Sequence, residues 1–240
     1  MADVAVVIGV NASAGLGAAI ARRFAREGLH TVVTGRTAGR LEQVAAEIND
    51  AGASASACVA DATDATALDA LMAHAAERGT VRAVLFNVGN NQPIAFDDLS
   101  AEQFENFWRV CTLSGFLAAK AALPLLEQSG GSLLFTGASA SLRGKPFFGH
   151  FASAKAALRN LAQAIARDYG PRGVHVGHVV VDGSINGDMV RGRFAGYLEE
   201  LGENGSLEPD AIADAFWFLH AQPTNCWTFE VDVRPFKENW

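Results

Sequence analysis

The sequence predicts a single α/β domain built on a doubly wound sheet of seven mainly parallel strands, with helices on both faces. Short runs rich in β-branched residues alternate with amphipathic segments along the chain, which is typical of parallel βαβ units. No internal repeat, low-complexity tract or linker divides the 240 residues, and this length suits one large core. We therefore expect one domain over residues 1–240.

The elements can be placed in chain order. The expected strands are 4–8, 31–34, 57–59, 83–86, 132–135, 174–180 and 227–231. The expected helices are 16–27, 38–51, 65–78, 101–127, 151–169 and 209–220. Ser100 and Gln103 form a capping-box pattern, and Pro209 stands where the first turn of a helix tolerates proline. Strands joined by crossover helices in this order predict a Rossmann-type sheet.

The first expected strand leads into a glycine-rich loop and then directly into a helix. The loop reads Gly9-Val-Asn-Ala-Ser-Ala-Gly-Leu-Gly17. Glycines suit such a loop because a Cβ would block the close approach of a pyrophosphate, which lies at the helix N-terminus. The pattern predicts a dinucleotide site, and a plain tight turn is the alternative.

The end of the second expected strand bears on the choice of cofactor. It reads Thr34-Gly-Arg-Thr37 and contains no acidic residue. An acid here would bind the adenosine ribose and repel a 2′-phosphate, whereas an arginine accommodates that phosphate. Arg36 therefore favours NADP(H) over NAD(H), unless it is only a solvent-facing loop charge.

The helix expected at 151–169 begins with Phe151-Ala-Ser-Ala-Lys155. Positions i and i+4 lie on the same face of a helix, so the Phe151 ring and the Lys155 amine should share one site. Taken alone, an ordinary core aromatic and a solvated lysine would be the simpler interpretation. The order of the other motifs favours a functional pair.

These motifs together resemble the short-chain dehydrogenase/reductase family, from Val4 to the last expected strand. Asn87-Val-Gly89 resembles the Asn-Ala-Gly motif of the family, and Asp61 stands where the family contacts adenine. The resemblance implies a nicotinamide cofactor site formed by Gly9, Asn11, Ser13, Gly15, Leu16, Gly17, Arg36, Asp61, Asn87, Gly89, Lys155, Gly183 and Ile185.

Two positions in the cofactor motifs depart from the family. The loop is usually Gly-x-x-x-Gly-x-Gly, and its first glycine falls at Asn11. Because asparagine tolerates left-handed backbone angles, we expect Asn11 to preserve the turn, with Gly9 taking part of that role. After the sixth strand the family has Pro-Gly, and here Asp182 precedes Gly183.

The catalytic positions depart further. The active site of the family contains an asparagine, a serine, a tyrosine and a lysine, and Lys155 matches the lysine. Phe151 takes the place of the tyrosine and can do no proton chemistry, while Cys111 takes the place of the asparagine. Strict register puts Ala138 at the serine position, and a slip of one residue puts Ser139 there.

The replacement for the missing phenol is open. His150 is adjacent in sequence, although a loop histidine bonded to backbone is its expected state. A water held by Ser139 or Ser141 is the second hypothesis.

Three functions are compatible with these substitutions. We favour an NADP(H)-dependent oxidoreductase that transfers hydride to or from a carbonyl or alcohol substrate by an altered proton route. A catalytically silent NADP(H)-binding protein, acting as a redox sensor or partner subunit, is the alternative. An isomerase or dehydratase on the same fold is the third.

Composition limits the partners. The net charge of −7, with no basic cluster longer than Arg22-Arg23, argues against nucleic acid or an anionic membrane surface. No apolar run predicts a membrane span, and the start of the chain lacks the basic region of a signal peptide. Cys58, Cys111 and Cys226 are expected to be free thiols in a reducing cytoplasm.

The remaining expectations concern metal, lid and assembly. His175 and His178 are three apart in a strand, so they should face opposite sides of the sheet, and no metal site is expected. Residues 184–205, here called the lid segment, should form a mobile cover over the substrate. The family implies a homodimer or homotetramer through the helices that carry 111–126 and 151–169. Because the large apolar ring of Trp240 would be costly to leave in water, we expect it to dock on a neighbouring subunit.

Overall fold

A computed structural model of the chain describes residues 2–89, 91–193 and 195–238. Its centre is a seven-stranded sheet of order β3-β2-β1-β4-β5-β6-β7, and every neighbouring pair of strands is parallel. The strands are β1 (Ala2–Ile8), β2 (His30–Gly35), β3 (Ala55–Val59), β4 (Gly79–Phe86), β5 (Ser132–Thr136), β6 (His175–Val181) and β7 (Glu230–Val233). The predicted fold class is confirmed.

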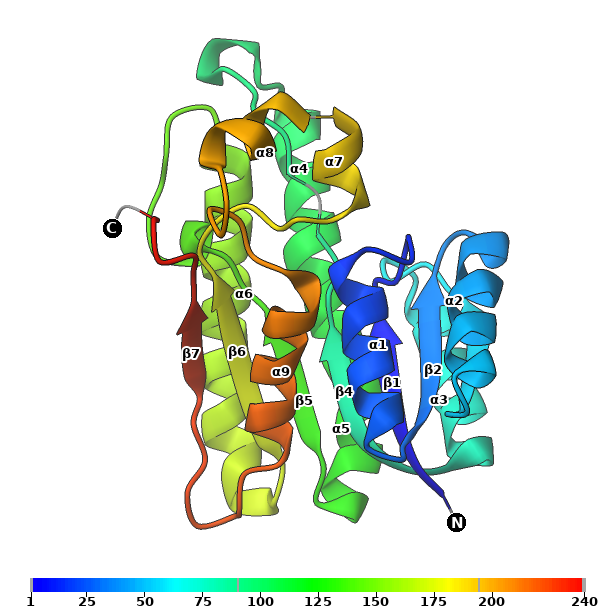
Figure 1. Cartoon of the computed structure of the whole chain (residues 1–240). Helices are drawn as coiled ribbons and strands as arrows, with labels where there is room; N and C mark the ends of the chain where they lie inside the picture. The colour runs from blue at the N-terminus through cyan, green and yellow to red at the C-terminus, as the bar shows by residue number, and fades with distance from the viewer. Residues whose placement is uncertain (1, 90, 194, 239–240) are drawn as a thin grey trace.

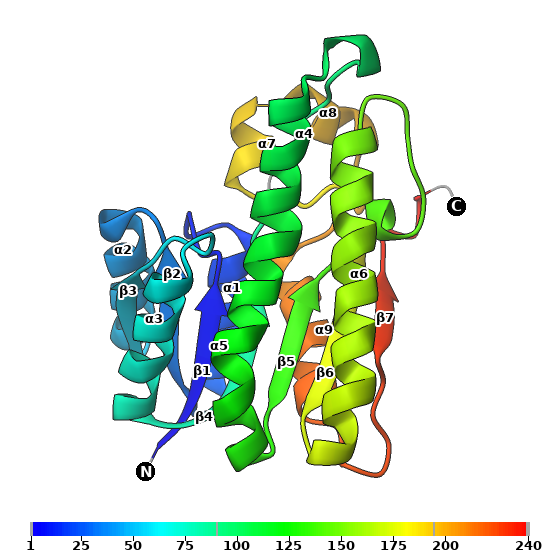
Figure 2. The ribbon, with the colours of Figure 1, turned by 180° about the vertical axis from the view of Figure 1, so that it is seen from behind.

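Helices cover both faces of the sheet. They are α1 (Leu16–Arg26), α2 (Ala38–Asp50), α3 (Ala65–Arg78), α4 (Ala101–Trp108), α5 (Ser114–Ser129), α6 (Gly149–Tyr169), α7 (Asp188–Arg193), α8 (Ala195–Leu201) and α9 (Pro209–His220). Helices α1, α2 and α9 pack on the face turned toward the viewer in Figure 1, and α3, α5 and α6 pack on the opposite face, seen in Figure 2. The sheet therefore separates two hydrophobic cores within one domain.

Several predicted boundaries differ from the structure by a few residues; β4, for example, was expected at 83–86 and begins at Gly79. The last strand was expected at 227–231 but begins at Glu230, because the preceding residues have other partners. Trp227 stacks on the His175 ring at 4.9 Å, and the Thr228 backbone N–H donates to the Gln222 side chain at 2.7 Å. The helix expected over 101–127 is interrupted by a π-helical turn, Arg109–Leu113. Such turns occur frequently at functional sites, and this one contains Cys111.

The long helix formed by α4, the π turn and α5 contributes to the second core. Its start has the predicted capping box, in which the Ser100 hydroxyl accepts from the Gln103 N–H at 3.1 Å. By length and composition, residues Ala101–Ser129 could span a membrane, with a mean hydropathy of 1.4 over 18 residues. Half of that stretch is buried in the protein, and core helices of globular proteins meet the same criteria.

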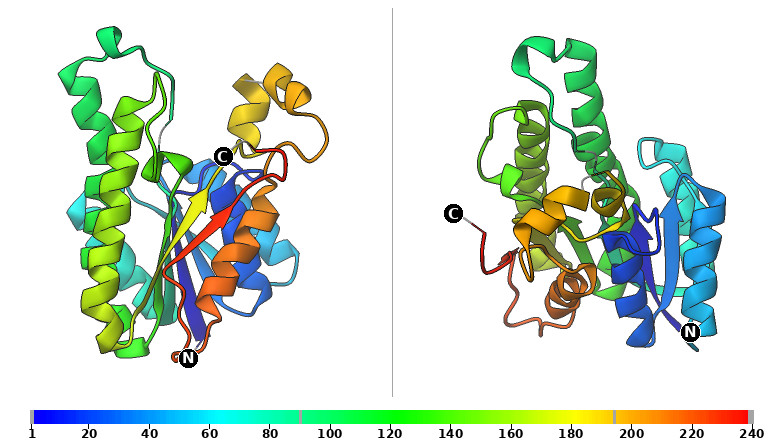
Figure 3. Two further views of the ribbon diagram at one scale, coloured as in Figure 1. Left: turned by 90° about the vertical axis from the view of Figure 1, so that its left-hand side faces the viewer. Right: turned by 45° about the horizontal axis from the view of Figure 1, so that its top comes forward.

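The lid segment lies beyond the carboxyl ends of the strands, where it forms α7 and α8 (Figure 3). Its base is fixed by a short parallel bridge, in which Leu207 N–H donates to Ser184 O and Asn186 N–H donates to Leu207 O, both at 2.8 Å. Mobility of this segment remains a prediction. Trp240 lies outside the residues that the structure describes.

Candidate active site

The glycine loop begins where β1 ends. Gly9 has φ +101°, and a Cβ at this position would lie 2.6 Å from the Asn87 carbonyl oxygen. A Cβ on Gly17 would lie 2.7 Å from the Gly9 carbonyl oxygen. Glycine is required at both positions by close backbone packing between β1, α1 and the end of β4.

The expectation for Asn11 was wrong. Among the described residues, the non-glycine positions with positive φ are Phe147 and Asn204. Gly9 adopts the positive φ of the turn because it is the residue that leaves the strand, and Asn11 uses its side chain instead. The Asn11 amide oxygen accepts from Arg40 Nη1 at 2.5 Å.

The start of α1 fits a bound pyrophosphate. Gly15 is the N-cap residue and supplies no side-chain hydrogen bond, and the first turn, which begins with buried Leu16, contains no acidic residue. The first N–H groups of a helix lack intrahelical partners and carry partial positive charge. They are therefore available to phosphate oxygens, as the loop pattern predicts.

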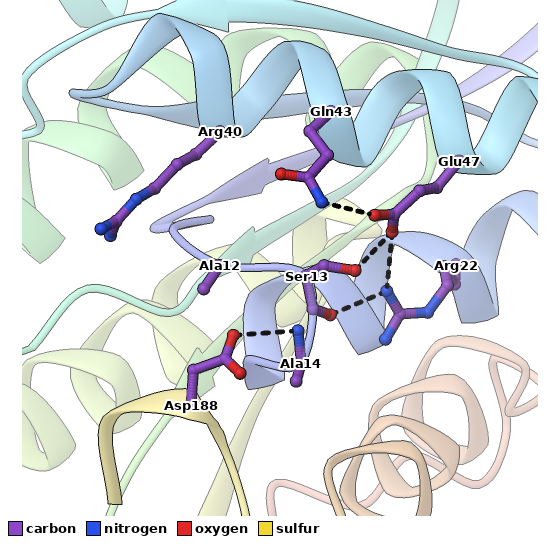
Figure 4. Close-up of a pocket in the computed structure, with 8 residues that line it drawn as sticks. All are labelled: Ala12, Ser13, Ala14, Arg22, Arg40, Gln43, Glu47 and Asp188. Atoms are coloured by element: carbon purple, nitrogen blue, oxygen red, sulfur yellow. Dashed lines mark hydrogen bonds and ion pairs between the residues drawn. The ribbon is translucent and has the colours of Figure 1, made fainter. Parts of the chain in front are cut away.

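An open pocket of about 820 Å³ borders the outer side of the loop (Figure 4). It is lined by Ala12, Ser13, Ala14, Arg22, Arg40, Gln43, Glu47 and Asp188. The Ser13 hydroxyl donates to Glu47, and Arg22 donates to the Ser13 carbonyl at 2.9 Å. Side chains from three helices thus hold the loop. Asp188 and Arg40 were not found by sequence reasoning, because their partners lie far away in the chain.

Arg36 and Asp61 lie at the ends of neighbouring strands. Arg36 is exposed just beyond β2, and Asp61 is exposed just beyond β3. The pKa of Asp61 is below its ordinary value because Thr63 donates to the carboxylate from its N–H and its hydroxyl, both at 2.8 Å, with a smaller effect from the charge of Arg36. The structure therefore brings the predicted arginine and acid together at this edge of the sheet.

A chain of hydrogen bonds joins the glycine loop to Lys155. Asn87 Nδ2 donates to the Gly9 carbonyl at 3.1 Å, and the Thr136 hydroxyl donates to Asn87 Oδ1 at 2.9 Å. Lys155 Nζ donates to the Thr136 carbonyl at 2.8 Å. The chain connects the ends of β1, β4 and β5 with α6, so it fixes the lysine relative to the loop. Thr136 is a further site residue that the sequence analysis did not identify.

Lys155 is buried, with 4% of its surface exposed. Burial lowers its pKa below the ordinary value, and the nearby Cys111 opposes this effect. Its ammonium lies 5.8 Å from the centre of the Phe151 ring, as the i, i+4 spacing predicted. A Cβ on Gly89 would lie 3.5 Å from Lys155 Nζ, so Gly89 borders the same space.

The catalytic positions form an apolar wall. Cys111, Phe151 and Ala154 make a buried cluster, against which Ala138 and Ala140 pack. Ser139 is half-buried and begins a short 3₁₀ turn, Ser139–Ser141. The Ser141 hydroxyl accepts from the Ala138 N–H at 3.2 Å, so it is partly engaged in that turn.

His150 is bound to backbone, as expected, although it lies in the first turn of α6 and not in a loop. It is 1% exposed, and its Nε2 lies 3.1 Å from the Gln92 carbonyl oxygen. Its ring centre lies 4.1 Å from that of Phe107. The Nε2 N–H of His150 therefore donates to a carbonyl and its ring packs on an aromatic side chain, which leaves that proton unavailable to a substrate.

Asp182, which stands in place of the usual proline, is buried and bonded on several sides. Arg143 Nη2 donates to both carboxylate oxygens, at 2.9 and 3.0 Å. The Asp182 N–H donates to the Val233 carbonyl at 2.9 Å. Gly183 follows with φ +146°, and a Cβ there would lie 2.7 Å from Pro235. Ile185 makes the bridge to Leu207 at the base of the lid segment.

The two strand histidines are separate, as predicted. His175 stacks on Trp227, whereas His178 Nδ1 lies 2.9 Å from Glu230 Oε2. Burial lowers the pKa of His178 to about 4, and Glu230 opposes this effect. Within the described ranges, no three His, Cys, Asp or Glu side chains form a group able to hold a metal ion.

Comparison with known proteins agrees with this geometry. A parallel doubly wound sheet with a glycine loop at the first crossover defines a dinucleotide-binding protein. The family model for short chain dehydrogenases matches residues 3–197, and the chain belongs to this family of nicotinamide-dependent oxidoreductases.

Several relatives cover nearly all of the chain. The chain is similar to 2-(S)-hydroxypropyl-CoM dehydrogenase 3 of Xanthobacter autotrophicus, with 32% identity over 86% of this chain and 85% of that protein. A short-chain dehydrogenase from Rhodopseudomonas palustris is 33% identical, with a TM-score of 0.83 over 98% of this chain and 99% of that one. An alcohol dehydrogenase from Thermococcus sibiricus, solved with 5-hydroxy-NADP, is 28% identical, with a TM-score of 0.86 over 100% of this chain and 99% of that one.

Proposed function

We propose that the protein is an NADP(H)-dependent oxidoreductase that acts on a small carbonyl or alcohol substrate and obtains its proton by a route other than the usual phenol. The observation that carries this proposal is the hydrogen-bonded chain from Gly9 through Asn87 and Thr136 to the buried Lys155. This chain keeps a cation in a fixed position relative to the glycine loop. Burial of an ammonium group costs free energy of folding, and hydrogen bonds offset only part of that cost. Buried charged groups of this kind are frequent at functional sites, which supports a role for Lys155.

Groups among the described residues suit three parts of the cofactor and support this proposal. The uncapped start of α1 suits the pyrophosphate. Arg36, together with Arg40, suits a 2′-phosphate, because both are exposed and no acid ends β2. Lys155 suits the nicotinamide ribose hydroxyls. When bound, NADPH supplies the hydride, and the residues of this chain bind it, orient it and exclude water from Lys155.

The same two arginines support the preference for NADP(H) over NAD(H). Quenching of tryptophan fluorescence measures the dissociation constants of NADPH and NADH. We expect NADPH to bind at least tenfold more tightly, and Arg36→Ala and Arg40→Ala to reduce that ratio. Arg26→Ala is the matched control, since Arg26 is exposed at the far end of α1. Equal affinity for both cofactors would contradict the preference.

The proton route is the part of this proposal that differs from the family. Among the groups considered, His150 donates its Nε2 proton to a backbone carbonyl, whereas the Ser141 hydroxyl only accepts from a backbone N–H. A water held at Ser139 or Ser141 is then the simplest donor. General acid catalysis by a side chain raises the rate by about 10²–10⁴-fold. Absence of the tyrosine hydroxyl therefore slows hydride transfer without abolishing it, because positioning of cofactor and substrate still contributes.

A catalytically silent NADP(H)-binding protein is the second candidate, favoured by the apolar wall of Cys111, Phe151 and Ala154. A panel of aldehydes, ketones and quinones, followed by NADPH absorbance, separates the two. Turnover of any member above the enzyme-free rate supports the oxidoreductase. Binding of NADPH without turnover across the panel supports the silent binder.

We further propose that the protein acts in the cytoplasm as a homodimer or homotetramer. Three aromatic side chains, Phe104, Trp108 and Phe116, are each between 41 and 43% exposed along α4 and α5. Burial of this row in a subunit interface would remove apolar surface from water. Light scattering tests the assembly, and a monomer for the wild type would contradict it. Trp108→Glu should weaken the assembly, and Phe218→Tyr on α9 should not.

A further inference from the structure

The lid segment contacts the glycine loop through Asp188, the first residue of α7. Asp188 Oδ2 accepts a hydrogen bond from the Ala14 N–H at 3.2 Å (Figure 4). The backbone of the lid segment also comes close, since a Cβ on Gly187 would lie 3.3 Å from the Ala14 carbonyl oxygen and 3.8 Å from Gly15 Cα. The two segments therefore touch at the residue just before the α1 N-cap.

The carboxylate is placed where the loop binds anions. Backbone N–H groups before and within the first turn of a helix attract negative charge. Helix α1 supplies neither a side-chain cap nor a first-turn acid of its own. Asp188, 174 residues away from Ala14 in the chain, brings a negative charge to this position. A pyrophosphate at the same N–H groups would meet a like charge at short range.

The position of Asp188 depends on the base of the lid segment. The bridge between Ile185 and Leu207 fixes the residues before α7. Asn186 Nδ2 donates to Glu208 at 2.7 Å, and Arg191 Nε donates to Asn186 Oδ1 at 2.7 Å. Asp188 lies only a few residues beyond the Ile185–Leu207 bridge. A rotation of α7 about this bridge would therefore move the carboxylate away from the loop.

The other charged groups of the pocket are already engaged. Glu47 bonds the Ser13 hydroxyl and lies 3.9 Å from Arg22, and Arg40 bonds Asn11. The Glu47 carboxylate is therefore paired with Arg22 on the α2 side of the loop, whereas on the α7 side the Asp188 carboxylate binds the loop N–H itself.

We propose that Asp188 is an internal ligand of the glycine loop that competes with the cofactor pyrophosphate, so that cofactor binding requires α7 to move away. The inference rests on the proposed NADP(H) site and adds a residue that sets its affinity. Asp188 acts as a competitor and not as a catalytic residue, because its contact is with the loop.

The test compares two neutral variants of the lid segment. Asp188→Asn removes the competing charge, and Glu199→Gln removes the same charge from an exposed position on α8. We expect Asp188→Asn to lower the dissociation constant of NADPH by about 3- to 10-fold, with Glu199→Gln unchanged within twofold. The effect of Asp188→Asn should shrink in high salt, because screening weakens the repulsion. Asp188→Glu, which keeps the charge, should restore weaker binding.

Two further measurements do not depend on the cofactor. Binding of inorganic pyrophosphate, measured by calorimetry, should strengthen in Asp188→Asn by a similar factor. Hydrogen exchange of the Ala14 amide should be faster in Asp188→Ala than in the wild type, because the carboxylate no longer protects it.

The outcomes distinguish failure of the Asp188 competition from failure of the proposed NADP(H) site. If Asp188→Asn binds NADPH and pyrophosphate no more tightly than the wild type, or if Glu199→Gln has the same effect, the competition is refuted. If no variant binds NADPH or NADH but Asp188→Asn binds pyrophosphate more tightly, the competition is supported and the proposed cofactor is refuted. Unchanged exchange at Ala14 would show that the contact is absent in solution.

Discussion

Replacement of Phe151 by tyrosine tests whether the site lacks only a hydroxyl group. The ring is 8% exposed, so the new hydroxyl would be buried. Without a partner it would cost about 1–3 kcal/mol of the free energy of unfolding. In a domain of this size each kcal/mol lowers Tm by about 2–4 °C, which gives a drop of about 2–12 °C. The ammonium of Lys155 lies 5.8 Å from the ring centre on the same helix face, so it can donate a hydrogen bond to the new hydroxyl oxygen. We therefore expect a Tm within about 2 °C of the wild type.

The same variant should gain activity. General acid help is worth about 10²–10⁴-fold, so Phe151→Tyr should raise kcat for reduction of simple ketones by NADPH by about this factor. The assay is the loss of NADPH absorbance with aldehydes and ketones. Phe218→Tyr is the matched control, because Phe218 is 54% exposed on α9. A folded Phe151→Tyr protein that binds NADPH like the wild type, yet reduces no ketone faster, would refute the reasoning.

Three other predictions concern the frame of the site. Lys155→Met should raise the dissociation constant of NADPH at least tenfold, because it removes the cation proposed to bind the ribose. It should not lower Tm, because it also removes the cost of a buried charge, and a lower Tm would show that the ammonium stabilises the fold. His178 has a pKa near 4, below its ordinary 6.5, so its contribution to stability is present above pH 6.5 and is lost as pH falls toward 4. In urea unfolding the wild type should therefore lose about 3 kcal/mol more of its free energy of unfolding over this window than His178→Gln, and equal losses would contradict the burial argument. Gly9→Ala should destabilise the protein by clearly more than Gly28→Ala, since both have positive φ but a Cβ on Gly28 meets nothing within 4 Å; equal costs in chemical denaturation would disprove the packing argument.

The architecture could be predicted from the sequence because each strand and crossover helix has a recognisable pattern of apolar residues within its own segment. The sequence also located the glycine loop, Asn87 and Lys155, since each follows a strand or begins a helix. It did not reveal Asp188 or Arg40, because their contacts with the loop depend on how distant segments meet in space. The role given to Asn11 was wrong for a related reason. The residue that must turn is set by where β1 ends, which is Ile8 as predicted, whereas the role of Asn11 was taken from the register of the family motif.

The apolar wall illustrates the same limit at the catalytic positions. Substitution of the family's polar residues could be identified from motif order alone. That Cys111, Phe151 and Ala154 pack together as one buried cluster could not, because it depends on how the π turn that carries Cys111 packs against α6.

The buried carboxylate after β6 restricts which residues can stand at position 182. A proline at position 182 has no N–H to offer β7 and no oxygen to offer Arg143, so the bonds that Asp182 makes would be lost together. A proline, as in the family motif, is thus not interchangeable with the aspartate found here. The closing strand and the loop before α6 both depend on Asp182, so a proline at this position would need compensating changes at both.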